Sequence, residues 1–240
     1  MLLLILQPLK MKLLHILTFT TSILISLTTI SQNVKDSTIT KTSYGIRIGA
    51  DILKPLVSVL ENNGSSFEII GDFRVYKNFY SAVELGFQEK TTNEDYLNFS
   101  TKGSYIKVGG NYNLYENWKG MHNEIYIGVR YAYSTFSQTL HNYTPNVKGT
   151  YFIPITIEDG QEFTNLNAQW IELIFGLKVE TLKNLYLGGS ISFNNMISTK
   201  EPTNFKNLQV PGFNKVNLNS AGVGFNYSIS YHIPIFKGIN

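Results

Sequence analysis

Three polar side chains near the end of the chain have the types and spacing that nucleophilic catalysis uses. Ser228, Ser230 and His232 alternate with apolar residues, so in an extended strand their side chains share one face. A serine hydroxyl activated by an imidazole base is the core of many acyl-transfer sites. Serine and histidine are also ordinary residues on the polar face of a strand, and the chain has no Gly-x-Ser-x-Gly nucleophile turn. We therefore expect no enzymatic activity.

Side chains that could bind a metal or a cofactor are scattered along the chain. His15, His122, His141 and His232 lack a ligand spacing such as His-Glu-x-x-His. The chain has no cysteine, which excludes disulfides, thiolate metal sites and a lipidated cysteine. The acidic run at 158–162 offers oxygen ligands for a divalent cation, but not in the Asp-x-Asp-x-Asp-Gly order of a calcium loop. We expect a solvated acidic loop there, no metal site and no cofactor.

The elements that would position these residues are strands. From residue 44 onward apolar and polar residues alternate, which is typical of a strand with two different faces. In the last segment every second residue from Val223 to Ile235 is apolar, and a helix would spread these residues around its circumference. The same test predicts about eight strands, at Tyr44–Ile52, Phe67–Val75, Ser81–Phe87, Tyr105–Leu114, Glu124–Tyr133, Trp170–Val179, Leu185–Phe193 and Val223–Ile235.

Charge is sorted between the two faces of these strands. The apolar faces carry no charged residue, although 15% of the chain is charged. The polar faces also carry many glycines, small residues that suit a narrow lumen. The polar faces hold the residues that we predict as a lumen charge network: Arg47, Asp51, Glu68, Asp72, Arg74, Glu84, Lys107, Glu124, Arg130, Glu172, Lys178 and Glu180.

The connections between strands alternate between short and long. Tight turns are expected at Lys77-Asn78, at 116–120 and at Lys183-Asn184. Longer polar loops are expected at Leu56–Ser66, Gln88–Gly103, Ser137–Ala168 and Ser198–Asn217. Bacterial outer-membrane barrels have this plan, with an even number of strands, short periplasmic turns and long extracellular loops.

Alternation alone does not say which face is outside. The apolar face would fill the interior of a secreted, soluble lipocalin-like barrel, and it would face lipid in a membrane barrel. Tyrosine and phenylalanine at the ends of the apolar faces, for example Phe67, Tyr133 and Tyr227, favour lipid because they suit an interfacial aromatic girdle. The sequence therefore predicts an all-β fold, an antiparallel transmembrane β-barrel of about eight strands.

The start of the chain has the layout of a secretory signal peptide. Lys10 and Lys12 precede an uncharged apolar run from Leu13 to Ile30. We expect a signal peptide at 1–31 with a natural start at Met11, a linker at 32–43 and one barrel domain at 44–240; a single transmembrane anchor is the alternative. Without the leader the formal net charge falls from +3 to +1, so the composition shows no sign of a nucleic-acid partner.

Three segments carry a resemblance to a known family: 44–55, 94–109 and Pro211-Gly-Phe-Asn-Lys215. They resemble an uncharacterised family of outer-membrane β-barrel proteins from Bacteroidota, a domain of unknown function, and the resemblance covers nearly all of the mature chain. It implies a location in the bacterial outer membrane and a barrel fold. The family has no assigned catalytic residues, so it implies no activity.

These observations favour a structural or surface-interaction role in the bacterial outer membrane, carried by the extracellular loops. A small-solute channel and an outer-membrane enzyme are the alternatives. The side chains of an eight-stranded barrel fill its interior, which argues against a wide pore. The expected partners are outer-membrane lipid and a surface or envelope protein, and the expected loop contacts are Tyr143, Tyr151, Phe152, Glu158, Asp159 and Phe163, with Trp170 as a further contact or girdle residue.

Overall fold

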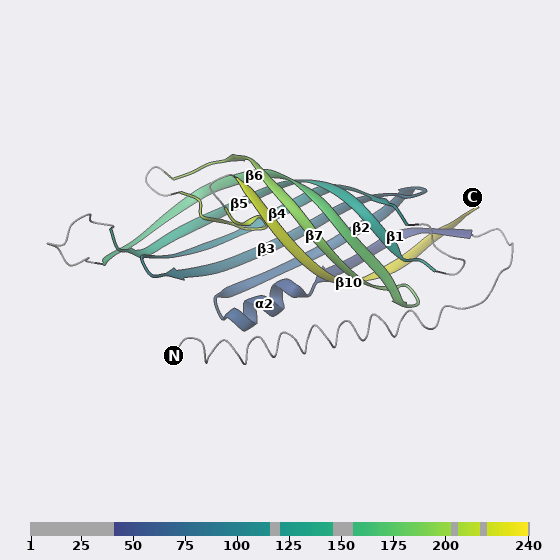
Figure 1. Cartoon of the computed structure of the whole chain (residues 1–240), viewed down its shortest axis with the longest axis horizontal. Helices are drawn as coiled ribbons and strands as arrows, with labels where there is room; N and C mark the ends of the chain where they lie inside the picture. The colour runs from purple at the N-terminus through teal and green to yellow at the C-terminus, as the bar shows by residue number, and fades with distance from the viewer. Residues whose placement is uncertain (1–40, 116–120, 146–155, 203–205, 217–219, 240) are drawn as a thin grey trace, which may run out of the picture. The chain divides into compact units, whose positions relative to one another are not determined.

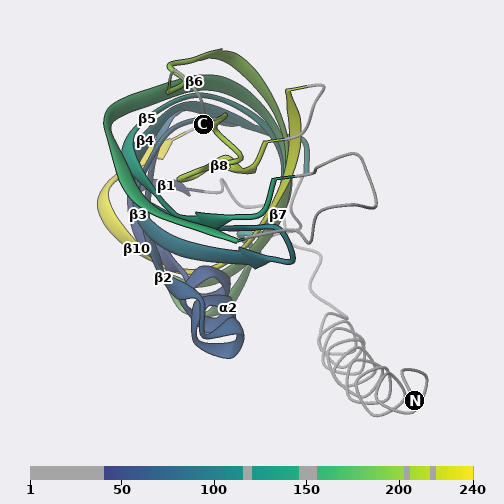
Figure 2. The same cartoon turned by 90° about the vertical axis from the view of Figure 1, so that its left-hand side faces the viewer.

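The computed structural model describes residues 41–115, 121–145, 156–202, 206–216 and 220–239. Eight antiparallel strands close into a barrel in the order β1–β10–β7–β6–β5–β4–β3–β2, and β2 pairs back to β1 (Figures 1 and 2). The strands are β1 (Lys41–Asp51), β2 (Gly64–Tyr76), β3 (Phe79–Glu94), β4 (Leu97–Asn113), β5 (Glu124–Tyr143), β6 (Ile157–Leu182), β7 (Leu185–Thr199) and β10 (Ala221–Ile239).

The predicted strands are confirmed. Each of the eight predicted segments falls within one barrel strand to within one residue. The turns at Lys77-Asn78 and Lys183-Asn184 join consecutive strands, and Lys77 and Asn184 adopt the positive φ (39° and 65°) that two-residue hairpins require. β1 begins at Lys41, so it includes the last residues of the predicted linker. The predicted signal peptide and the predicted turn at 116–120 lie outside the described residues.

The two faces of the barrel wall differ in polarity as the alternation requires. Large apolar side chains point outward around the barrel, including Ile229 (38% exposed) and Phe225 (62% exposed). The residues that alternate with these along each strand point inward, and they include the buried charged residues. A soluble lipocalin-like barrel needs the reverse arrangement, so that alternative is wrong. The fold is that of a membrane-spanning barrel.

The predicted loop at Leu56–Ser66 is wrong, because most of it is helix α2 (Leu53–Glu61). The Asp51 carboxylate accepts hydrogen bonds from the backbone N–H groups of Leu53 (2.7 Å) and Lys54 (3.2 Å), which caps the first turn. The helix ends at Asn62, whose φ of 50° is left-handed. No helix among the described residues is long and apolar enough to cross a membrane.

Two of the predicted long loops are largely strand. β3 and β4 continue through most of Gln88–Gly103 and leave a turn at Asp95-Tyr96, and β5 and β6 continue to Tyr143 and from Ile157. The four strands therefore extend past the rest of the barrel as one curved sheet, toward the left in Figure 1. We call this part the β3–β6 extension.

The fourth predicted loop, Ser198–Asn217, does not simply project from the barrel. It contains a small hairpin of β8 (Gln209–Val210) and β9 (Asn214–Lys215) that folds into the barrel (Figure 2). The buried segment 209–213 fills the end of the lumen where the long connections lie. We call residues 207–216 the plug, and we call the two ends of the barrel the loop end and the turn end.

Candidate functional site

The candidate site is the barrel lumen, where the inward phase of the strands collects charge. Ten of the twelve residues predicted for the lumen charge network are buried. Charged side chains that are buried away from bulk water need partners of opposite charge or hydrogen bonds. The structure arranges them in three adjoining clusters from the turn end to the loop end.

The first cluster centres on Arg47, near the turn end. Its guanidinium donates hydrogen bonds to both Asp72 oxygens (3.0 and 3.1 Å) and to Glu124 (2.9 Å). Lys178 forms a second ion pair with Asp72. The guanidinium also lies over the rings of Tyr80 and Tyr186, at 5.5 and 4.8 Å from their centroids. Arginine suits this position because it can pair with two carboxylates and stack on aromatic rings at once.

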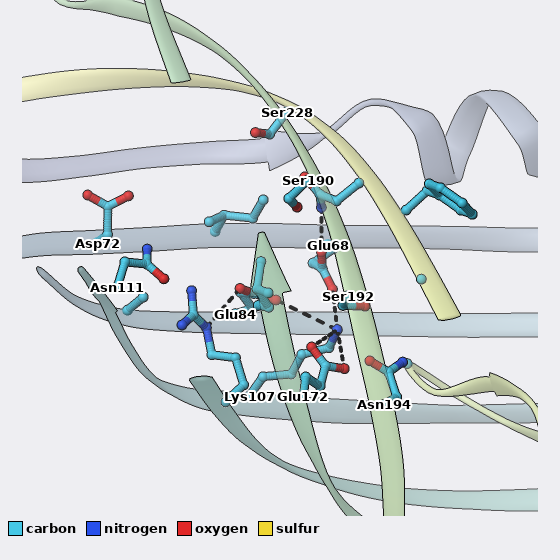
Figure 3. Close-up of a pocket in the computed structure, with 18 of the residues that line it drawn as sticks. Glu68, Asp72, Glu84, Lys107, Asn111, Glu172, Ser190, Ser192, Asn194 and Ser228 are labelled. Carbon is cyan, nitrogen blue, oxygen red and sulfur yellow. Dashed lines mark hydrogen bonds and ion pairs between the residues drawn. The ribbon is translucent and has the colours of Figure 1, made fainter. Parts of the chain in front are cut away.

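The second cluster lies in the middle of the lumen. Lys107 lies between carboxylates, with its Nζ 3.0 Å from Glu172 and 3.7 Å from Glu84 (Figure 3). Glu84 also accepts a hydrogen bond from Arg130 Nε at 3.1 Å, and Glu172 accepts one from the indole N–H of Trp170 at 2.7 Å. Each carboxylate therefore has a cationic partner and a position fixed by several contacts.

The third cluster lies behind helix α2. Lys54 forms an ion pair with Glu68 and donates a hydrogen bond to the hydroxyl of Tyr105 (3.0 Å), which in turn donates to Glu68 (2.8 Å). Asn226 donates to Asp51 (2.8 Å) and to Glu68 (3.0 Å), and so links β10, β1 and β2. The cluster is part of the lumen network, and Lys54 reaches it from the helix rather than from a strand.

An apolar core seals the loop end above these clusters. Phe213 and Val210 of the plug are fully buried, and Phe213 meets Trp170 edge to face with ring centroids 5.7 Å apart. The Tyr105 ring fits between two glycines, since a Cβ on Gly86 or Gly212 would lie within 2.6 Å of its atoms. Gly212 also has a φ of 84°, which favours glycine. Hydrogen bonds from Gly212 N–H and Gln138 further fix the plug.

The space left in the lumen is small. The cavity among the central charges has a volume of about 40 Å³, and the cavity at the turn end has about 100 Å³. Each has room for a few water molecules. With the plug above and paired charges below, the lumen is a filled interior rather than a wide pore.

Two predicted network residues lie apart from the buried clusters. Arg74 is half-buried near the turn end, where it donates to the carbonyl oxygen of Lys77 and lies over the rings of Tyr44 and Tyr80. Glu180 lies 2.7 Å from His122 Nδ1 and accepts a hydrogen bond from the backbone N–H of Asn184 (2.7 Å). Both residues belong to the rim at the turn end.

The predicted loop contacts have mixed surroundings. Glu158 and Asp159 are exposed on the β3–β6 extension. Tyr143 is half-buried, and Phe163 is half-buried against the apolar core that contains the plug. Trp170 is fully buried in that core, so its prediction as a contact or girdle residue is wrong. Tyr151 and Phe152 lie outside the described residues.

The residues that first suggested catalysis do not converge. Ser228 lines the central cavity, whereas His232 lines the cavity at the turn end beside Tyr186. Among the described residues no group of three or more His, Asp or Glu side chains is arranged to hold a metal ion.

Two parts of the site, Lys54 and the plug, were not predicted from the sequence. Lys54 lies outside the alternating pattern, and its spacing of three residues from Asp51 is a weak signal. The plug residues Val210 and Phe213 flank a Pro-Gly pair that is typical of a loop. The one signal in the sequence that this turn is buried was the apolar residue on each side of it.

Fold and lumen together define the class: a closed eight-stranded membrane barrel with an apolar outside and a charged, filled inside. The sequence matches the family described as Domain of unknown function (DUF6048) over residues 9–238. The chain therefore belongs to the DUF6048 family. A search of curated proteins finds no match.

Solved barrel structures are similar to the chain at low sequence identity. Neisserial surface protein A (NspA) has 10% identity and a TM-score of 0.43, with 81% of this chain and 99% of that chain covered. Ail, the attachment invasion locus protein of Yersinia pestis, has 8% identity, a TM-score of 0.38 and coverage of 80% and 99%. A major outer membrane protein from Thermus thermophilus has 13% identity, a TM-score of 0.37 and coverage of 80% and 98%.

Proposed function

We propose that this protein resides in the bacterial outer membrane as a closed, non-conducting and non-enzymatic barrel that presents the β3–β6 extension at the cell surface. The observation that carries the proposal is the separation of the two faces. Apolar side chains cover the outside of the strands, while the buried lysine, arginine and carboxylate side chains pair inside. A bilayer penalises outward charge, and a filled lumen gives solutes no wide path.

The β3–β6 extension is the part that we assign to interaction with a surface or envelope protein. In the described part of the chain β6 pairs with β7 from Ala168 onward, and the Asn167 carbonyl oxygen still accepts a hydrogen bond from Lys200 N–H (2.8 Å). Residues 157–166 therefore form an edge that has β5 on one side. This edge carries exposed acidic residues. It is also interrupted by two residues with positive φ, Gly160 (69°) and Asn165 (58°). Such features protect an edge strand from uncontrolled pairing. Recognition through side chains, among them Glu158 and Asp159, is the mode that this edge supports.

Fractionation of native cells tests the location. The protein should be recovered with the outer membrane and should migrate faster on a gel before boiling than after it, because a closed barrel stays compact in cold detergent. Recovery in the soluble periplasmic fraction would contradict the proposal.

Surface labelling tests the orientation, and the absence of native cysteine makes single-cysteine variants clean probes. In intact cells a membrane-impermeant maleimide should label Asn93→Cys and Asp159→Cys in the extension. Asn184→Cys at the turn end should react only after the cells are permeabilised. Equal labelling of the three variants in intact cells would rule out this orientation.

A further inference from the structure

One strand of the wall stops short of its neighbours at the loop end. β1 ends at Asp51, and the last backbone bond on this side runs from Ile52 N–H to the carbonyl oxygen of Tyr227 (2.8 Å). β10 continues to Ala221, and β2 extends back to Gly64. In the described part of the chain, residues 222–226 of β10 and 64–68 of β2 pair with a strand on one side only. The wall therefore has a lateral notch above the end of β1.

Helix α2 lies at this notch, against β2 and β10, without filling it (Figure 1). A cavity of about 200 Å³ remains between the helix and the two strands. An apolar protein cavity of roughly 150 Å³ can hold a benzene molecule, so the space admits a ligand segment of at least that size. Its apolar lining comes from Leu53, Val57, Val223 and Phe225, and Ser66 belongs to its polar lining.

The notch opens at the level where the outside of the barrel changes from apolar to charged. Phe225 and Phe67 point outward and are 62% and 50% exposed. Beside Phe87, the partner of Phe67, the half-buried Glu89 and the exposed Lys102 form an ion pair of 3.2 Å. This boundary is where lipid headgroups meet a membrane barrel. A molecule that approaches the notch from outside is therefore a membrane amphiphile.

Helix α2 continues the apolar surface on the side away from the barrel. Leu56, Val59 and Leu60 are 56%, 77% and 75% exposed, and no residue of the helix is buried. A short amphipathic helix at a bilayer surface places such residues among acyl chains. The apolar lip of the notch and the exposed face of the helix thus offer one surface to a hydrocarbon chain.

The inside of the notch offers hydrogen-bonding groups to a headgroup. Ser66 is only 8% exposed, and its hydroxyl has no hydrogen-bond partner among the residues that the structure describes. The backbone of Tyr227 faces the β1 side, so the backbones of Phe225 and Val223, which alternate with it, also face that side beyond the end of β1. A buried hydroxyl without a partner is costly, and a bound headgroup would supply the missing partner.

The charge of the lining narrows the class of headgroup. The lining contains two lysines, Lys54 and Lys90, and two glutamates, Glu61 and Glu89, and Lys90 lies 3.5 Å from Glu61. Lys54 is already paired with Glu68. Equal numbers of cationic and anionic groups favour a headgroup with no net charge over an anion.

We propose that the lateral notch binds a membrane amphiphile whose headgroup carries no net charge. The hydrocarbon chain lies outside, along Val57, Phe225 and the exposed face of α2. The headgroup enters the notch and exchanges hydrogen bonds with Ser66 and with the free backbone edge of β10. This proposal rests on the proposed membrane location, but its test does not depend on that location.

Binding is measured on the full chain, purified and delipidated in a polyoxyethylene detergent. The probe is myristoyl lysophosphatidylcholine, and native mass spectrometry and titration calorimetry report its stoichiometry and affinity. We expect one saturable molecule per barrel. Val57→Trp, which fills the notch, should weaken binding by about tenfold or more, because the apolar contact is replaced by a blocking ring. Val75→Trp, at an exposed valine of β2 beside the turn end and far from the notch, is the matched control and should bind as the wild type does.

Ser66→Ala separates the role of the headgroup from that of the chain. It removes the hydroxyl with little change in shape, and it should weaken binding by roughly two- to tenfold, the range for one net hydrogen bond. Gel mobility before and after boiling shows whether each variant has folded, so lost binding in a folded variant reports on the notch.

Four results would overturn the proposal. The first is that the lysolipid does not bind the wild type saturably, and the second is that it binds Val57→Trp and the wild type equally. The third is that myristate binds more tightly than the lysolipid. The fourth is that the wild type forms dimers that Val57→Trp abolishes. The last result would mean that a second copy occupies the notch. Saturable binding by a protein that is absent from the outer membrane would refute the location and leave the site intact, whereas correct location without binding would refute the site alone.

Discussion

Removal of Arg47 tests whether the paired lumen charges hold the barrel together. In Arg47→Leu, Asp72 keeps its ion pair with Lys178, but Glu124 loses its bonds to the guanidinium, the shortest at 2.9 Å. Breaking a buried ion pair by removal of one partner costs roughly 3–5 kcal/mol. The cavity of about 100 Å³ beside Arg47 lets water hydrate part of Glu124, which lowers this cost. We therefore expect a loss of about 3 kcal/mol in the free energy of unfolding.

Urea unfolding in phosphatidylcholine vesicles, followed by tryptophan fluorescence, measures this loss. Arg74→Leu is the matched control, since Arg74 lies at the rim outside the buried clusters, and it should cost less than about 1 kcal/mol. Adding Glu124→Gln to Arg47→Leu removes the uncompensated charge and should recover roughly 1–2 kcal/mol, within the range of coupling between contacting residues. Equal losses for the two arginine variants, or no recovery in the double variant, would refute the stabilising role of the network.

Three further predictions concern the outside, the plug and the helix. Ile229→Arg places a charge in the outward apolar band and should cost roughly 2–4 kcal/mol in vesicle unfolding; wild-type stability would show that this position does not face hydrocarbon. Phe213→Ala should shift the fluorescence of Trp170 to longer wavelength and cost up to about 3–5 kcal/mol, less if the plug undocks; an unchanged spectrum would contradict their contact. The hydrogen bond from Asn63 and the charge of Lys90 hold the pKa of Glu61 below its ordinary 4.5. The ionised Glu61 therefore stabilises the fold above pH 4.5, and this stabilisation is lost as the pH falls through the lowered pKa. NMR titration should find the pKa of Glu61 raised in Asn63→Ala, and an unmoved pKa would contradict this assignment.

The transmembrane strands could be predicted because two constraints act on every residue in them. Each outward side chain meets lipid and each inward one meets the lumen, so a charged residue such as Arg130 has only one allowed phase. The same constraint places the turns, since a two-residue hairpin leaves little choice beyond residues such as Asn184 that tolerate a positive φ.

Outside the bilayer these constraints disappear, and the predictions failed there. Residues 157–165 of β6 are mostly polar and exposed, so the strand has no apolar face to reveal it. The plug depends on contacts distant in sequence, such as Phe213 with Trp170, which a local pattern does not contain. Helix α2 was missed because nine residues with an internal proline give too short a helical period to recognise.

The individual ion pairs within the lumen also could not be predicted from the sequence. The partner of Lys107 depends on barrel closure and on the relative register of strands, which bring Glu172 of β6 within 3.0 Å. Alternation specifies that both residues face inward, but it does not say at what height each lies.

Planar-bilayer recording of the purified wild-type barrel tests the central claim, a closed lumen, most directly. Insertion is verified on the same preparation by its faster gel migration before boiling. We expect no stepwise conductance in concentrated potassium chloride, because paired charges and the plug fill the lumen. A reproducible ohmic conductance whose ion selectivity changes when Arg130 or Glu172 is neutralised would contradict the closed barrel and identify the protein as a channel.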